Sequence, residues 1–317
     1  MTAITEDAPA IRDADVKPVG GRVGAVIENI RLSGDLPDAV IARLEDLLRR
    51  YKVLFFPGQH LDDAAQEAFG ARFGAPFAHP TQGSLRGTAS VLDLDTRRSG
   101  EPEQGQAGGA RADQWHTDIT FLEAYPRISI LRAVVVPEAG GDTVFSNTVA
   151  AYETLPEPLK ALADRLWAVH SNAYDYASVR PHASAEERRQ FEKQFTSTVY
   201  ETEHPVVRVL PNGERTLLLG NFVQRFVGIS RADFQKLFAL LQEHVQALEN
   251  TVRWRWQAGD VVVWDNTATQ HYAVNDYGDQ HRVVRRVTIE GDVPVSVDGR
   301  RSRSRGQYAK PAAIAAE

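Results

Sequence analysis

Two residues in the first half of the chain, His116 and Asp118, have the types and the spacing of metal ligands. They lie two positions apart in Trp115-His-Thr-Asp118, and side chains at this spacing share one face of a β-strand. The residues that follow favour a strand, so we predict one here. His271 is the best candidate for a third ligand. Two histidines and one carboxylate leave three octahedral positions open, which is the facial triad of non-haem Fe(II) oxygenases.

Two arginines that follow His271 indicate an anion site. Arg282 lies eleven residues after His271, and Arg286 lies four further on, so we predict that the two arginines share one strand face. Buried arginines need anionic partners, and the sequence offers no acidic run that would pair with them. We therefore predict a small anion with one or more carboxylates. Thr143 begins a short β-prone run after Gly-Gly-Asp, and its hydroxyl can hydrogen-bond to the same anion.

The composition excludes several classes of function. The chain has 317 residues, 43% of them hydrophobic, with a net charge of −6 and a pI of about 5.9. This charge gives no general attraction to nucleic acid or to anionic lipid. The absence of cysteine excludes disulfides, thiolate metal sites and cysteine nucleophiles. No apolar stretch approaches membrane-spanning length, and no signal peptide is visible. We expect a cytoplasmic protein that binds neither nucleic acid nor membranes.

The order of the expected elements indicates a mainly β fold with flanking helices. Many short β-prone runs are joined by Gly/Pro turns, which is typical of a β-sandwich or barrel. We predict a disordered tail over residues 1–16, a single domain over 17–303 and a flexible tail over 304–317. Within the domain we expect a lid loop at about 80–114 and a helical insertion at about 155–250.

Local patterns place the main helices and strands. Asp62 is predicted to cap a helix. Helices are predicted over Leu36–Tyr51, Leu155–Trp167 and Arg231–Leu248, the last capped by Ser230. Strands are predicted over Lys52–Phe56, Arg127–Val136, Thr143–Phe145, Val261–Trp264 and Val283–Ile289.

Less specific interpretations compete with the metal site. Without its surroundings, a His-x-Asp pair is as compatible with a hydrogen-bonded pair on a strand as with a pair of metal ligands. His79 precedes Pro80 in a loop, where a surface or capping histidine is the plain interpretation. His281 precedes Arg282 and points to the opposite strand face, so we exclude it from the metal site. Asp265 and Asn266 are expected to organise the turn before the third ligand.

Several motifs together resemble the taurine dioxygenase family of Fe(II)/2-oxoglutarate-dependent oxygenases, over about Gly20 to Arg303. They are Trp115-His-Thr-Asp118, Gly140-Gly-Asp-Thr143, Trp264-Asp-Asn266 with His271, and Arg282 with Arg286. Other stretches resemble in particular the alkylsulfatase branch of this family. They are the runs Phe195–Arg208, Asn250–Trp256 and Gln270–Val274.

This resemblance implies a double-stranded β-helix (jelly roll) with Fe(II) bound by His116, Asp118 and His271. The co-substrate 2-oxoglutarate would chelate the iron through its C1 carboxylate and keto oxygen. Its distal carboxylate would pair with Arg282 and accept a hydrogen bond from Thr143.

The resemblance also implies residues that contact the substrate. Arg286 would hold the sulfo group of the substrate or assist the co-substrate. His79 matches a histidine that contacts the sulfo group, and Ile119 matches a residue whose backbone lies against the substrate. Family members commonly self-associate, so we expect a homo-oligomer.

The implied reaction consumes O2 and 2-oxoglutarate and forms succinate and CO2. The carbon that bears a sulfate ester would be hydroxylated, and the product would collapse to an aldehyde and free sulfate. Taurine-like sulfonates and aryloxyalkanoates are alternative substrates, because Thr96–Asp113 is longer and richer in Gly and Gln than the family pattern. A zinc hydrolase and a non-catalytic anion-binding jelly roll are alternatives of another class. The hydrolase does not explain Arg282 and Thr143, and the intact triad argues against the second.

Overall fold

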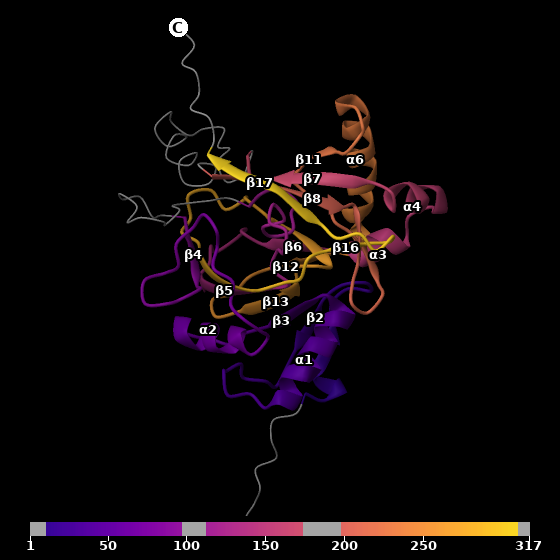
Figure 1. Cartoon of the computed structure of the whole chain (residues 1–317). Coiled ribbons are helices and arrows are strands. Elements are labelled where there is room, and N and C mark those ends of the chain that lie inside the picture. The colour runs from indigo at the N-terminus through magenta and orange to yellow at the C-terminus, as the bar shows by residue number, and fades with distance from the viewer. Residues whose placement is uncertain (1–10, 97–111, 174–197, 310–317) are drawn as a thin grey trace, which may run out of the picture.

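The computed structural model describes residues 11–96, 112–173 and 198–309, and its core is built from β-sheets (Figure 1). The largest sheet has seven strands in the order β1-β2-β3-β13-β5-β15-β4. They are β1 (Val16–Pro18), β2 (Ala25–Ile27), β3 (Val53–Phe56), β13 (Val261–Asp265), β5 (Ile128–Val135), β15 (Val283–Ile289) and β4 (Leu92–Asp95). All neighbouring pairs are antiparallel except β2 and β3.

Three smaller sheets complete the described structure. One contains β12 (Thr251–Trp254), β6 (Thr143–Asn147) and β14 (Thr269–Ala273), in that order. A second contains β11 (Val223–Phe226), β7 (Trp167–Ser171), β8 (Thr198–Pro205) and β17 (Arg303–Ala309). The third contains β10 (Arg215–Leu217), β9 (Val207–Val209) and β16 (Val295–Ser296).

The β12-β6-β14 sheet packs face to face on the seven-stranded sheet. Phe145 of β6 lies 6.0 Å from Phe55 of β3 and 5.4 Å from Trp264 of β13, measured between ring centroids. All three side chains are buried, because alternate residues of each strand point into the space between the sheets. The mainly β jelly-roll fold predicted from the sequence is confirmed.

Helices cover the outside of these sheets. They are α1 (Asp38–Tyr51), α2 (Asp63–Ala71), α3 (Thr148–Glu153), α4 (Glu157–Ala163) and α6 (Arg231–Val245), with short 3-10 turns at Asp13–Asp15 and Leu248–Asn250. The apolar stripe of α1, including Leu44 and Leu48, is buried in the core cluster that contains Val263 and Val287 of the large sheet. The predicted caps are confirmed: the Asp62 carboxylate accepts from the Ala65 amide, and the Ser230 hydroxyl accepts from the Asp233 amide.

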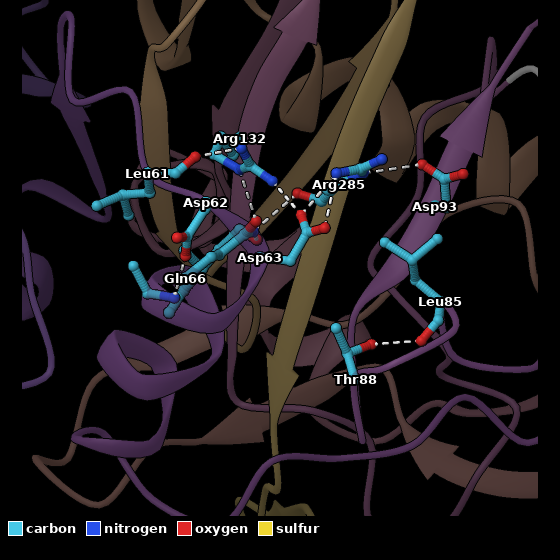
Figure 2. A network of polar contacts seen from close by, with 11 residues as sticks. Leu61, Asp62, Asp63, Gln66, Leu85, Thr88, Asp93, Arg132 and Arg285 are labelled. Carbon is cyan, nitrogen blue, oxygen red and sulfur yellow. Dashed lines mark hydrogen bonds and ion pairs between the residues drawn. The ribbon is translucent and has the colours of Figure 1, made fainter.

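A polar network joins α2 to the outer face of the large sheet (Figure 2). Arg132 of β5 and Arg285 of β15 are register partners, and both donate to the Asp63 carboxylate of α2. Gln66, one turn further along α2, donates to the Arg285 carbonyl oxygen at 2.8 Å and accepts from Arg132 Nε at 3.0 Å. Arg285 also donates to Asp93 of β4 at 3.1 Å. The helix therefore fixes where β15 lies between β5 and β4.

The segment over about 155–250 is not the helical insertion that was predicted. Its described part contains β7 to β11, and only α4 and α6 are helices. The helix predicted over Leu155–Trp167 ends at Ala163, and Trp167 begins β7. The run Trp-Ala-Val-His-Ser is buried between two partner strands, so tertiary pairing overrides the helical pattern that precedes it.

The predicted tails and lid also contain ordered structure. The six residues after Arg303 complete β17, which pairs with β8, so the predicted tail over 304–317 begins in a sheet. Near the N-terminus Asp15 is buried, and its carboxylate accepts from Arg12 and Asn29. Within the predicted lid, Leu92–Asp95 is β4 of the large sheet, and residues 97–111 lie outside the described residues.

Candidate active site

His116, Asp118 and His271 converge on one point, where the ring of His271 lies against Phe145 and Trp264 of the two facing sheets. Each offers one ligand atom, and the three atoms lie within 4.8 Å of one another. Nε2 of His116 is 3.8 Å and Nε2 of His271 is 3.9 Å from Oδ1 of Asp118. All three side chains are buried. The structure thus brings together the three ligands selected from the sequence, although they lie on segments far apart in the chain.

The local conformation differs from the predicted strand. His116 makes an isolated antiparallel bridge to His271, with backbone hydrogen bonds of 3.1 and 2.8 Å. The chain then turns, and Ile119 has a left-handed φ of 59°, which is rare for a β-branched residue. The carboxylate of Asp118 therefore reaches the histidines because the chain turns after the bridge, and strand alternation does not place it there.

The protonation states suit metal coordination. His116 Nδ1 lies 2.7 Å from the Gln114 carbonyl oxygen, an acceptor, so the proton resides on Nδ1 and the Nε2 lone pair faces the site. Burial lowers the pKa of His116 and of His271, which favours the neutral imidazole. Burial alone would raise the pKa of Asp118, but the positive charge of Arg286 and the hydrogen bond from Ser129 hold it below its usual range. Two neutral imidazoles and one carboxylate fit a divalent transition metal.

A cavity beside His271 contains the predicted anion-binding residues. It is lined by Thr143, Arg282 and Arg286 among others. Arg282 is only 8% exposed, and its Nε donates to the Gly141 carbonyl oxygen at 3.3 Å. Among the described residues no carboxylate pairs with its guanidinium. The Thr143 hydroxyl accepts from Trp256 Nε1 at 2.9 Å, so its own proton is left for an acceptor in the cavity.

Arg286 corrects the expectation that both arginines lack an acidic partner in the protein. Its Nη1 donates to Asp118 Oδ1, while its buried Nε has no partner among the described residues. The two side chains lie 168 positions apart in the sequence, so a search for acidic runs near the arginine does not find this pair. Arg286 consequently lies next to the candidate metal ligands, and Arg282, just before β15, lines the same cavity.

The two residues proposed to contact the substrate occupy different surroundings. His79 is half-buried, with its Nδ1 accepting from the Thr81 amide at 3.2 Å. Burial, followed by the positive charge of nearby Arg286, lowers the pKa of His79. Ile119 is buried in an apolar cluster with Phe121 and Phe222. The ring of Phe222 meets that of His116 edge to face, at 6.5 Å between centroids.

Two contributors to the site were missed by sequence reasoning. The Ser129 hydroxyl donates to Asp118 Oδ2 at 2.8 Å, which leaves Oδ1 facing the histidines. The sequence signal that could have identified Ser129 is its position as a hydroxyl residue within the apolar run of β5. Phe222 lies in a segment without a pattern of its own, and nothing local predicts that it reaches His116. His281, excluded from the sequence-based metal site, contacts Asp95 at 2.9 Å and lies outside the ligand cluster.

Residues 15–288 match the family model described as "Taurine catabolism dioxygenase TauD, TfdA family". The chain belongs to this family of dioxygenases, as its motifs predicted. It is 58% identical over 299 residues to an alpha-ketoglutarate-dependent sulfate ester dioxygenase of Pseudomonas putida, covering 94% of this chain and 96% of the relative. It is 51% identical over 291 residues to an alkylsulfatase of Acinetobacter baylyi, covering 91% and 89%.

The fold is similar to solved structures of the same kind. A crystal structure of a taurine dioxygenase from Burkholderia xenovorans superposes with a TM-score of 0.74 at 35% identity, covering 91% of this chain and 95% of that one. Within the described part of the chain, no helix has the length and apolar character needed to cross a membrane.

Proposed function

We propose that this protein is an Fe(II)- and 2-oxoglutarate-dependent dioxygenase that cleaves alkyl sulfates by oxidation. The observation that carries the proposal is the buried cluster of His116, Asp118 and His271 beside the buried guanidinium of Arg282, which has no acidic partner among the described residues. A metal ligand set next to a buried cation suits a co-substrate that has both a chelating end and a distal carboxylate. The names of the two relatives, a sulfate ester dioxygenase and an alkylsulfatase, support the substrate class.

The metal would be held by His116 Nε2, His271 Nε2 and Asp118 Oδ1. When bound, Fe(II) supplies the activation of O2 that couples oxidative decarboxylation of 2-oxoglutarate to hydroxylation of a C–H bond. Ser129 donates a hydrogen bond to Oδ2 of Asp118, so Asp118 would offer its other carboxylate oxygen to the metal. The protein otherwise contributes burial, orientation and charge.

Arg282 and Thr143 would bind the distal carboxylate of 2-oxoglutarate. The planar guanidinium can donate two parallel hydrogen bonds to a carboxylate, and the Thr143 hydroxyl proton adds a third donor. Because Arg282 is buried without an acidic partner among the described residues, the incoming carboxylate neutralises a charge that is costly to leave alone. This gives the pocket a physical reason to select a dicarboxylate.

The substrate would lie between a polar end and an apolar wall. Arg286 and neutral His79 would donate hydrogen bonds to a sulfate group. Ile119, Phe121 and Phe222 form a buried apolar surface beside His116 that suits an alkyl chain. This surface favours an alkyl sulfate over a small polar sulfonate such as taurine.

The release of sulfate needs no hydrolytic nucleophile from the protein. Hydroxylation of the carbon that bears the ester gives a 1-hydroxyalkyl sulfate. Its C–O bond to the sulfate breaks as the hydroxyl electron pair forms the aldehyde C=O bond, and the hydroxyl proton leaves to solvent. The absence of cysteine is compatible with this route. The cytoplasmic location and the homo-oligomer expected from the sequence stay predictions.

The proposal is tested by measuring succinate and sulfate released by Fe(II)-loaded protein. The panel contains a medium-chain alkyl sulfate, taurine and an aryloxyalkanoate, each with and without 2-oxoglutarate and O2. We expect the alkyl sulfate to stimulate succinate formation and to yield one sulfate per succinate. Stimulation by another member alone would reassign the substrate. Sulfate release that needs neither O2 nor 2-oxoglutarate would favour the zinc hydrolase.

A further inference from the structure

Three consecutive residues at the start of the site are each held by the segment Asn266–His271, which runs from the turn after β13 into β14. The backbone of His116 pairs with that of His271 on β14. The Thr117 hydroxyl donates to the Thr269 carbonyl oxygen at 2.7 Å. The backbone of Asp118 is held by the side chain of Asn266, from the turn between the two strands. The segment Asn266–His271, which carries one candidate metal ligand, therefore positions the segment that carries the other two.

Asn266 contacts both backbone polar groups of Asp118. Its Oδ1 accepts from the Asp118 amide at 3.0 Å, and its Nδ2 donates to the Asp118 carbonyl oxygen at 3.2 Å. The same Nδ2 donates to the Pro126 carbonyl oxygen at 2.8 Å. The side chain is 0% exposed, so bulk water does not compete with these hydrogen bonds. Asn266 thus pairs with Asp118 as a neighbouring strand would.

The turn itself does not need the Asn266 side chain. Asp265 closes it, since its carboxylate accepts from the Thr267 amide at 2.9 Å and its carbonyl oxygen accepts from the Thr269 hydroxyl at 2.8 Å. The sequence-based expectation that both residues organise the turn thus describes Asp265 correctly. The Asn266 side chain instead reaches across to the segment that contains Asp118.

The hydrogen bonds from Asn266 to the Asp118 backbone, called the clamp below, hold a strained conformation at the next residue. Ile119 has a left-handed φ of 59°, which L-residues with a branched Cβ adopt only where the surroundings impose it. Without the clamp, the backbone at Asp118 and Ile119 can relax toward an extended conformation. Relaxation would carry the Asp118 carboxylate away from the two imidazoles.

We propose that Asn266 is a positioning residue that sets the geometry of the metal ligand Asp118. This inference rests on the proposed function, because it requires that the cluster binds a metal. Residues that orient ligands typically change metal affinity by about 10- to 100-fold when they are removed. Asn266 acts on the backbone of the ligand, whereas Ser129 acts on its carboxylate.

The experiment measures anaerobic Fe(II) affinity by calorimetric titration, together with the free energy of unfolding of the metal-free protein. The variant is Asn266→Ala, and the matched control is Asn250→Ala. Asn250 is also a buried asparagine with hydrogen bonds from its amide, 2.9 Å to the His244 carbonyl oxygen and 2.8 Å from Arg22. It contacts none of the three ligands. Should the alanine variant not fold, Asn266→Leu keeps a similar side-chain volume but loses all three hydrogen bonds, and it is measured in its place.

We expect Asn266→Ala to weaken Fe(II) binding at least tenfold, while Asn250→Ala stays within twofold of the wild type despite a comparable loss of stability. Wild-type affinity in the Asn266 variant would overturn the inference. So would equal weakening in both variants, since that follows from lost stability alone. A wild-type protein that binds no Fe(II) would instead contradict the proposed function.

Discussion

Replacement of Arg282 by alanine removes the only charge that we assign to the distal carboxylate of 2-oxoglutarate. Arg282 is 8% exposed, and among the described residues its guanidinium makes one hydrogen bond, from Nε to the Gly141 carbonyl oxygen. Loss of one partner of a buried, hydrogen-bonded charge pair costs about 2–5 kcal/mol. Since about 1.4 kcal/mol corresponds to tenfold in affinity, the KM for 2-oxoglutarate should rise by roughly 30-fold to several thousand-fold.

The assay measures succinate formation against 2-oxoglutarate concentration at saturating alkyl sulfate. Arg285→Ala is the matched control, because Arg285 is three residues further along and pairs with Asp63 on the outer face of the sheet. That variant should be less stable but keep the wild-type KM. Arg282→Lys should fall between wild type and Arg282→Ala, because it keeps the charge and loses the planar fork.

Two results would refute the reasoning on Arg282. A KM for 2-oxoglutarate within threefold of the wild type would place the distal carboxylate elsewhere. An equal rise in the Arg285→Ala control would mean that general damage to β15, and not the lost pair, sets the KM. Fe(II) affinity measured without 2-oxoglutarate should not change in Arg282→Ala, because this side chain contacts none of the metal ligands.

Two further predictions concern stability. Burial lowers the pKa of His204 in the folded protein to about 3. Between about pH 6.5 and 3, His204 is therefore protonated in the unfolded chain and neutral in the folded one. The contribution of neutral His204 to the free energy of unfolding is complete above about pH 6.5 and falls by about 1.4 kcal/mol per pH unit below it. The free energy of urea unfolding, measured at pH 7 and pH 5, should therefore depend less on pH in His204→Gln than in the wild type. An unchanged pH dependence would contradict the assignment. Asp63→Asn leaves the buried Arg132 without its carboxylate and should cost about 3 kcal/mol, the lower end for a broken buried pair because Asp63 is partly exposed. Urea unfolding checks this as well, and a loss below about 1 kcal/mol would show that the network in Figure 2 does little for stability.

The cluster of three candidate ligands could be predicted from the sequence because each residue type carries its own chemistry. His116, Asp118 and His271 were selected by residue type and spacing, and those survive any error in local structure. The predicted strand over these residues was wrong beyond His116. The β-prone residues after Asp118 are overridden by tertiary contacts, above all those from Asn266, which is 148 positions away.

Other errors have the same physical origin. Leu155–Trp167 has a helical pattern throughout, but Trp167 joins a sheet because β8 and β11 flank it in space. The Ser/Arg/Gly-rich run after Arg303 has no strand pattern, yet it pairs with β8 along a sheet edge. The pairing of Arg286 with Asp118 also depends on the fold. Contacts between distant segments leave no periodic signal, so spacing alone does not reveal them.

The most direct test of the account is the binding of 2-oxoglutarate to the wild-type protein, measured by anaerobic calorimetry with and without Fe(II). If the ligand cluster and Arg282 form one site, Fe(II) should bind with a stoichiometry of one and should raise the affinity for 2-oxoglutarate at least tenfold. Replacement of His271 by alanine should abolish that increase. Equal affinity with and without Fe(II), or an increase that survives in His271→Ala, would contradict the claim that these residues form one metal and co-substrate site.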